Sequence, residues 1–96
     1  MSAYWIAHVT VTDPDAYAGY QALAPAAFAA HGARFLARGG ACETLEGPAF
    51  DRHVVIEFPT LEAARACYGS EAYQRARLTR ADAAIAHVVI VEGLSF

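Results

Sequence analysis

Four strand-like segments alternate with helix-like segments along the chain, and their order limits the fold to a small set of topologies. The strand-like segments are rich in β-branched and aromatic residues, and apolar residues recur at helical spacing between them. We predict strands over residues 3–12, 33–45, 52–58 and 86–92, and helices over residues 14–31, 61–68 and 71–80. Gly69-Ser70 ends the first of the two helical segments at 61–80, and Ser70 is expected to cap the second.

The order strand-helix-strand-strand-helix-strand is typical of a split βαβ fold. It predicts a ferredoxin-like α+β domain whose four-stranded antiparallel sheet has the spatial order 4-1-3-2, with the helices on one face. Ninety-six residues suit a single domain, and we assign residues 1–96 to it. Residues 3–12 alternate between an apolar side and a side of mixed polarity, as expected for a sheet with one face against helices.

The other face of this sheet would have no helix to cover it. It would expose apolar side chains from three strands, namely Tyr4, Ile6, Val55, Val89 and Val91. An apolar patch of this size favours the pairing of two sheets, so we expect a homodimer. The hydrophobic content of 56% agrees with such an interface.

Capping residues and glycines indicate where the elements begin and end. Asp13 is a suitable N-cap for the first helix, and Gly32 suits its end. Pro25 lies inside that helix and is expected to kink or divide it. Gly39 and Gly40 interrupt the second strand, which suggests a bulge or a close backbone approach.

Charge and cysteine content exclude several classes of partner. The formal net charge is −3, all seven basic residues are arginines and no basic stretch is present, so we expect no nucleic-acid partner. No apolar run is long enough to cross a bilayer, and no signal-peptide pattern is visible, so we expect no membrane association. Cys42 and Cys67 form no CxxC pair, and no cysteine–histidine spacing suggests zinc. We expect a reduced cytoplasmic protein with no metal site and no cofactor.

An ordered series of short motifs runs along nearly the whole chain. Its members are Val11-Thr12-Asp13-Pro14-Asp15, Arg38-Gly39-Gly40, Leu45-Glu46-Gly47, Val55-Ile56-Glu57-Phe58-Pro59, Glu62-Ala63-Ala64, Tyr68-Gly69-Ser70, Glu71-Ala72-Tyr73-Gln74 and Val91-Glu92-Gly93. With these motifs the chain resembles family 1330 of the domains of unknown function, within the dimeric α+β barrel superfamily. The resemblance implies a ferredoxin-like protomer that dimerises sheet against sheet. The chain departs from the family pattern in lacking a proline after Ser70.

The resemblance implies no particular activity. Relatives in the superfamily include cofactor-free monooxygenases, small isomerases, haem-dependent enzymes and ligand-sensing domains. A shared fold does not decide among these functions. Candidate site residues therefore have to be argued from their own chemistry.

A ligand site could form where Arg38 precedes Gly39 and Gly40. An arginine on a strand can hold a carboxylate or phosphate through two hydrogen bonds, and glycines let a ligand approach the backbone. The alternative for Arg38 is a structural ion pair with Glu57 on the neighbouring strand. Two other arginines are expected in solvent or in ion pairs; they are Arg52 and Arg80, with Glu46 and Glu92 as the acidic partners.

Four tyrosines lie at helical positions, namely Tyr17, Tyr20, Tyr68 and Tyr73. Their spacing indicates rings that pack in the core with hydroxyl groups near its rim. The alternative is that Tyr20 and Tyr68 line the mouth of a pocket between the helices and the sheet. Both residues are therefore kept with Arg38 as candidate ligand-binding residues.

His8 and Glu57 are the candidate acid/base residues, and both belong to the face that carries no helix. A carboxylate on a half-buried sheet face is costly unless it is paired, and if desolvated Glu57 could act as a general base. His8 lies on the central strand, with His53 and His87 as potential neighbours in a register that the sequence does not set. The alternatives are a hydrogen-bonded structural histidine and an ion-paired carboxylate.

These residues support two main functional hypotheses. The first is a small-molecule-binding dimer, a carrier or a sensor, that holds an organic anion through Arg38 at the sheet face or the dimer cleft. The second is a cofactor-independent enzyme of the monooxygenase or isomerase type, with His8 or Glu57 as the base. A purely structural module is a third interpretation.

Overall fold

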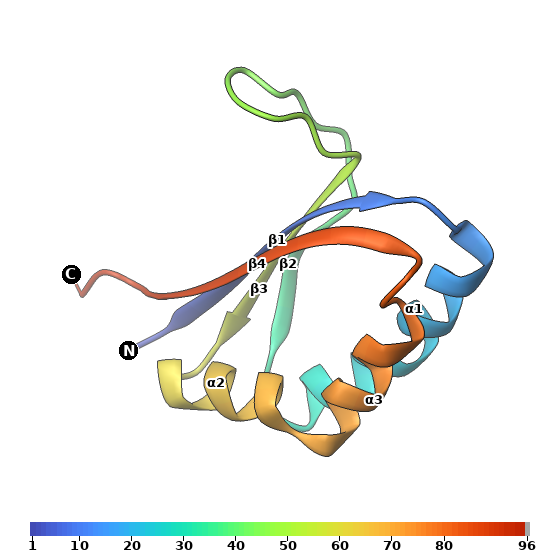
Figure 1. Ribbon diagram of the computed structural model, residues 1–96. Helices are drawn as coiled ribbons and strands as arrows, with labels where there is room; N and C mark the ends of the chain where they lie inside the picture. Colours follow the sequence, from blue (N-terminus) through green and yellow to red (C-terminus); the bar gives the residue numbers. More distant parts are fainter. Residues whose placement is uncertain (96) are drawn as a thin grey trace.

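The structure is a computed structural model that describes residues 1–95 (Figure 1). Its elements are β1 (Ala3–Val11), α1 (Pro14–Ala29), β2 (Arg34–Arg38), β3 (Arg52–Phe58), α2 (Leu61–Gly69), α3 (Glu71–Thr79) and β4 (Ala84–Glu92). The four strands form one antiparallel sheet in the order β2-β3-β1-β4. This is the predicted 4-1-3-2 arrangement, and the ferredoxin-like fold is therefore confirmed.

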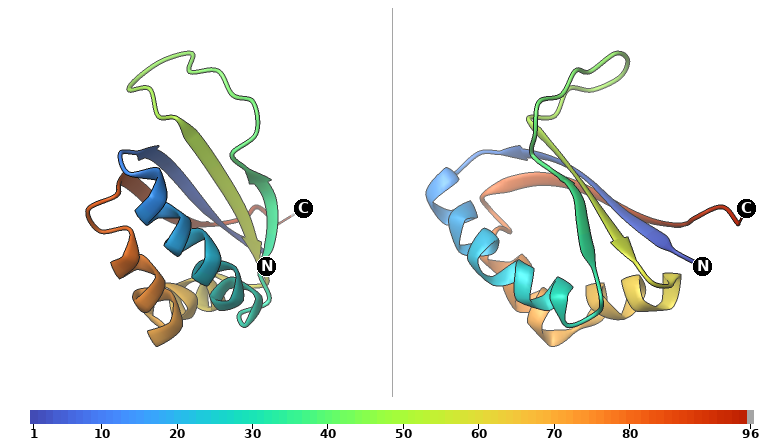
Figure 2. Two further views of the ribbon diagram at one scale, coloured as in Figure 1. Left: turned by 90° about the vertical axis from the view of Figure 1, so that its right-hand side faces the viewer. Right: turned by 180° about the vertical axis from the view of Figure 1, so that it is seen from behind.

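The helices cover one face of the sheet and leave the other face bare (Figure 2). Helix α1 packs against α3, whereas α2 packs against β1, β3 and β4. The segment between β2 and β3, residues 39–51, projects beyond the sheet on the side away from the helices (Figure 1). The molecule thus has two distinct surfaces, one between sheet and helices and one on the bare face.

Side-chain caps begin the helices as the sequence predicts. Asp13 Oδ1 accepts a hydrogen bond from the Ala16 N–H at 3.2 Å, and Ser70 Oγ accepts one from the Tyr73 N–H at 3.2 Å. Of the two effects expected of Pro25, a kink or a division of the first helix, the division does not occur, because α1 continues to Ala29. The missing Pro25 hydrogen bond is tolerated because this helix buries an apolar face; its buried residues are Tyr17, Ala24, Ala27 and Phe28.

Strand β2 is shorter than predicted, since it ends at Arg38 rather than near Leu45. The pairing of β2 with β3 is already irregular between Phe35 and Ala37, so the bulge precedes the glycine pair. Gly39 then takes the left-handed conformation with φ +70°, which turns the chain away from the sheet. Sequence composition alone did not distinguish the exposed segment after Gly39 from a longer strand.

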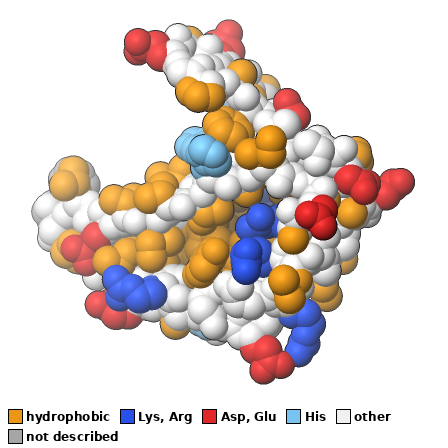
Figure 3. Space-filling model, in the orientation of Figure 1, with side chains coloured by type: hydrophobic (Ala, Val, Ile, Leu, Met, Phe, Trp, Pro, Cys, Tyr) orange, Lys and Arg blue, Asp and Glu red, His pale blue; other side chains and the backbone are white. Residues whose placement is uncertain are grey.

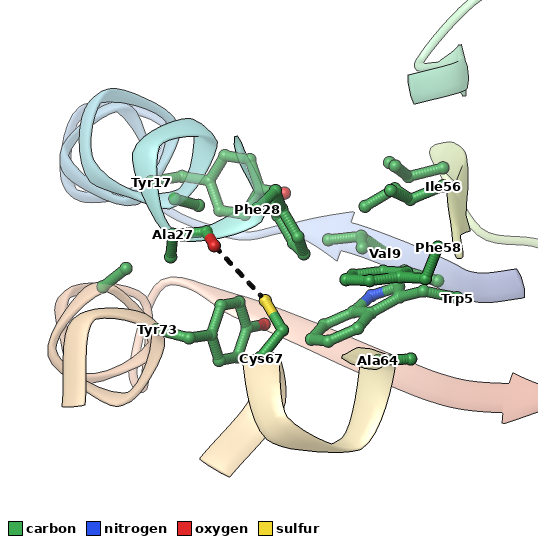
Figure 4. Packing of buried hydrophobic residues seen from close by; sticks show 14 of the residues in the cluster. Trp5, Val9, Tyr17, Ala27, Phe28, Ile56, Phe58, Ala64, Cys67 and Tyr73 are labelled. Carbon is green, nitrogen blue, oxygen red and sulfur yellow. Dashed lines mark hydrogen bonds between the residues drawn. The ribbon is translucent and has the colours of Figure 1, made fainter. Parts of the chain in front are cut away.

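Aromatic rings from the sheet and the helices form the core around Trp5 (Figure 4). The Trp5 ring lies 5.0 Å from the Phe28 ring and 5.0 Å from the Tyr73 ring, both edge to face, and stacks on Phe58 at 6.0 Å. Burial raises the pKa of Cys67 to about 11, so this thiol stays protonated, and its Sγ donates to the carbonyl oxygen of Ala27 at 3.6 Å.

The bare face carries the exposed apolar residues that the sequence predicts. Val89 is 52% exposed and Val91 is 46% exposed, and Ile85 on the same strand is 56% exposed. Tyr4, Ile6 and Val55 on the neighbouring strands are partly exposed. Among the helices formed by residues 1–95, none is long and apolar enough to cross a membrane.

Candidate functional site

A cavity of about 570 Å³ lies between the sheet and α1. Its walls are mainly aromatic and aliphatic, and they include Trp5, Val9, Phe28, Phe35, Val54 and Ile56. Figure 3 shows the space beneath the sheet, where apolar side chains meet arginine side chains. Three arginines line the cavity, one each from β2, the start of β3 and the end of α3. An apolar cavity with a few convergent polar groups is the usual form of a small-molecule site.

Arg80 is the most buried of the three arginines, with 9% of its surface exposed. Its Nη2 donates to the Tyr73 hydroxyl at 3.2 Å, and its guanidinium lies 4.9 Å from the centre of the Tyr20 ring. Within residues 1–95, Arg80 has no carboxylate partner. A guanidinium has five N–H donors, and here most of them are left for a ligand.

Arg52 lies at the start of β3 and lines the cavity. Its guanidinium is 5.8 Å from the centre of the Tyr17 ring, and its Nε is buried without a hydrogen-bond partner in the described part of the chain. Gly39 makes room for this group, because a Cβ at Gly39 would lie 2.9 Å from the Arg52 Cζ. Buried donors are normally satisfied, so the unpaired Nε points to a missing partner.

Arg38 is exposed at the rim of the cavity. Its guanidinium stacks over the Phe35 ring at 4.4 Å, which holds the side chain near the cavity without neutralising its charge. The alternative ion pair with Glu57 is not formed, because Glu57 Oε1 accepts from Arg34 Nη2 at 2.7 Å instead. Arg38 is therefore available to a ligand.

Two tyrosine hydroxyls add neutral hydrogen-bonding groups to the site. Tyr20 and Tyr73 share a hydrogen bond of 3.0 Å between their Oη atoms, and Tyr20 lines the cavity. Burial is the main cause that raises the pKa of Tyr20, and burial also raises the pKa of Tyr17 against the opposing charges of Arg52 and Arg80. These phenols stay protonated at neutral pH and can donate hydrogen bonds.

The remaining predicted ligand-binding residues lie in different places. Gly39 borders Arg52, whereas Gly40 is exposed with open space around its Cα. Tyr68 is 40% exposed and lines a second cavity next to the first, rather than the first cavity itself. Of the predicted set, Arg38 and Tyr20 line the cavity, and Gly39 contacts it only through Arg52.

The predicted acid/base residues lie on the bare face, away from the cavity. His8 pairs with His53 in register, and their Nδ1 atoms are 2.7 Å apart, so one donates a hydrogen bond to the other. Glu57 faces Tyr4, four residues along β1 from His8, and forms the ion pair with Arg34. His8 and Glu57 therefore do not pair with each other.

The prediction for Arg80 is wrong, because Arg80 is buried and pairs with neither Glu46 nor Glu92. Arg52 is partly buried, lines the cavity and forms neither of those ion pairs. The signals were nevertheless present in the sequence. Arg52 is in phase with a period-two stripe of buried residues along β3, namely Val54, Ile56 and Phe58. Arg80 follows the buried Tyr73 by seven residues, which is two helical turns, and so shares its face.

A family model matches this chain over residues 2–94, and its description is a domain of unknown function, DUF1330. The chain belongs to this family. No curated protein matches it. Solved structures that resemble this DUF1330 chain share its fold.

One such structure is a protein of unknown function from Rhodopseudomonas palustris, with a TM-score of 0.76 and 18% identity, over 98% of this chain and 83% of that one. SnoaB from Streptomyces nogalater, described as a cofactor-independent oxygenase, has a TM-score of 0.66 and 13% identity, over 99% and 95% of the two chains. A dimeric ferredoxin-like protein of unknown function from Bacteroides fragilis has a TM-score of 0.65 and 12% identity, over 96% of each chain. At these identities the likeness concerns the fold alone.

Proposed function

We propose that this DUF1330 chain binds a small organic anion with an aromatic or other apolar body in the cavity between the sheet and α1. One observation carries the proposal. Arg52 and Arg80 line an apolar cavity, and within residues 1–95 neither has a carboxylate partner. The ligand's anionic group would supply the missing partner, and its apolar body would lie against Trp5 and the aliphatic floor.

The energetics of burial support this assignment. Holding a guanidinium out of water without a counter-charge costs several kcal/mol in general, and hydroxyl and ring contacts offset only part of that cost. An anion that bridges Arg52 and Arg80 would form charge-assisted hydrogen bonds, which are about twice as strong as neutral ones. The cavity therefore favours an anion over a neutral molecule of the same shape.

A cofactor-independent enzyme is less well supported by the geometry. The residues that line the cavity, within the part of the chain that is described, include no histidine and no carboxylate that could act as a base. His8 and Glu57 belong to the other face of the sheet. An enzymatic role in this cavity would instead use the arginines to stabilise a substrate as its anion, as in electrostatic catalysis.

A matched ligand pair tests the binding function. We expect 2-naphthoate to bind the wild-type chain at least about tenfold more tightly than the neutral 2-naphthamide, measured by isothermal titration calorimetry. Arg52→Gln should remove most of this preference. Arg75→Gln is the control, because Arg75 is exposed and pairs with Glu71 outside the cavity. Equal affinity for acid and amide in the wild-type chain would refute the proposal.

The bare face supports a second proposal, that two copies pair through their sheets. The exposed valines of β4 and the partly exposed apolar residues of β1 and β3 form one apolar surface, which is costly in water. The Bacteroides fragilis protein of the same fold is described as dimeric. In this arrangement His8, His53 and His87 would lie within the interface.

A further inference from the structure

The arginines that have a carboxylate partner lie in different places from those that have none. Two of the seven form ion pairs, Arg34 with Glu57 and Arg75 with Glu71, each at 2.7 Å. Neither of these two lines the cavity described above or the second one beside it. The other five have no ion pair within residues 1–95, and all five line one of two adjoining cavities; they are Arg38, Arg52, Arg65, Arg77 and Arg80.

The second cavity, of about 600 Å³, lies between β4 and the pair of helices α2 and α3. Arg65 and Arg77 line it together with Tyr68 and Ile90. It is open because α3 packs against α1 rather than over β4, so the inward side chains of β4 remain only partly buried. Figure 3 views the molecule from the β4 edge and shows this hollow between sheet and helices.

The two cavities are joined at Arg80. Arg80, Ala86 and Val88 line both of them, so one apolar strip of β4 continues from the first cavity into the second. The guanidinium of Arg80 therefore lies where the inner, first cavity meets the outer, second cavity. The second cavity is also lined by Arg65 and Arg77. A short monoanion at Arg52 and Arg80 would leave Arg65 and Arg77 without a counter-charge.

We infer that the ligand is elongated and carries two anionic groups separated by an apolar segment. The inference rests on the proposed anion-binding function and specifies its ligand class. One anionic group binds Arg52 and Arg80 in the inner cavity. The apolar segment lies along Ala86 and Val88, and the second anionic group binds Arg65 and Arg77.

The partners of Arg77 fit this role. Its Nε donates to Gln74 Oε1 at 2.9 Å, which fixes the side chain while its terminal N–H groups remain available. Arg65 approaches from α2 and Arg77 from α3, so an anion between them would bridge two helices that share the Ser70 cap. Arg65 and Arg77 line the same cavity, so their positive charges repel each other, and a bound anion would reduce this repulsion.

Linear carboxylates of graded length separate this inference from simple anion binding. The probes are the α,ω-dicarboxylates from hexanedioate to hexadecanedioate and the monocarboxylates of the same lengths, titrated calorimetrically. We expect one range of chain lengths at which the dicarboxylate binds about tenfold more tightly than its monocarboxylate. The double variant Arg65→Gln/Arg77→Gln should remove this advantage and leave monocarboxylate affinity unchanged.

Two variants complete the design. Arg52→Gln should weaken both probe types, because it removes the inner anion contact, whereas Arg75→Gln on the same helix as Arg77 should weaken neither. Arg65 is exposed and Arg77 partly exposed, so unchanged thermal unfolding is expected for the double variant.

If monocarboxylates bind through Arg52 but no dicarboxylate binds more tightly, the two-anion inference is overturned and the proposed function stands. If no linear probe binds, the two-anion inference is overturned, and the proposed function is overturned with it only if 2-naphthoate also binds no better than 2-naphthamide.

Discussion

The buried charge of Arg80 is expected to lower the stability of the folded, ligand-free chain. The buried Arg80 guanidinium donates to the Tyr73 hydroxyl and lies over the Tyr20 ring, but it has no anionic partner in residues 1–95. Replacing buried charged groups by apolar ones of similar volume is often neutral or stabilising. The position of Arg80 is therefore better explained by ligand binding than by folding.

This explanation gives a prediction with opposite signs for stability and binding. Arg80→Met should raise the free energy of unfolding of the ligand-free protein by about 1–2 kcal/mol, because it removes an uncompensated buried charge. The same variant should lose the binding of 2-naphthoate. Urea denaturation measures the first effect and calorimetry the second. A clear loss of stability in Arg80→Met would show instead that the Tyr73 contact holds the fold together.

At the scale of elements, the turn that ends β2 lies against the side chain of Arg52. Gly39 combines φ +70° with a close approach to the Arg52 guanidinium, whereas Gly47 in the same connection has φ +86° and no heavy atom within 4 Å of an added Cβ. The two glycines thus share a backbone constraint and differ in their contact with the site. This difference provides a matched pair of substitutions.

Gly39→Ala and Gly47→Ala should each destabilise the fold by about 1 kcal/mol, because an L-residue is strained in the left-handed region. Only Gly39→Ala should also weaken 2-naphthoate binding, by roughly tenfold, because the new methyl group displaces Arg52. Thermal unfolding and calorimetric titration of both variants check this. Equal affinity in the two variants would mean that Arg52 does not contact the ligand.

The same comparison of elements explains what the sequence could and could not predict. The element order, the caps at Asp13 and Ser70 and the sheet order depend on local patterns and general topology, and they were predicted correctly. The length of β2 was not, because sequence composition alone did not show that the residues after Gly39 are exposed and lie outside the sheet. The cavity-lining position of Arg52 was not predicted, although Arg52 is in phase with Val54 on β3.

At the scale of the whole molecule, one sheet separates two environments. Its inner face and the helices enclose the arginine-lined cavities, although the chain as a whole has a net charge of −3. Its outer face carries the exposed apolar residues of β4, together with the His8–His53 contact and the ion-paired Glu57. Self-association through the outer face would leave the inner cavities open to solvent and ligand, so the two proposals are structurally compatible.

This separation can be tested by a charge placed on each side of the molecule. Val89→Asp puts a carboxylate on the outer face, and in a symmetric dimer both copies would carry it. We expect the dimer dissociation constant to rise by about 100-fold or more, measured by sedimentation velocity, because two charges would be buried without partners. Leu78→Asp is the control, since Leu78 is 67% exposed on α3 and lies in the helix layer. Its dimer should match the wild type, and 2-naphthoate should bind all three proteins alike.

A wild-type chain that stays monomeric at micromolar concentration, or a Val89→Asp dimer as tight as the wild type, would exclude pairing through the outer face.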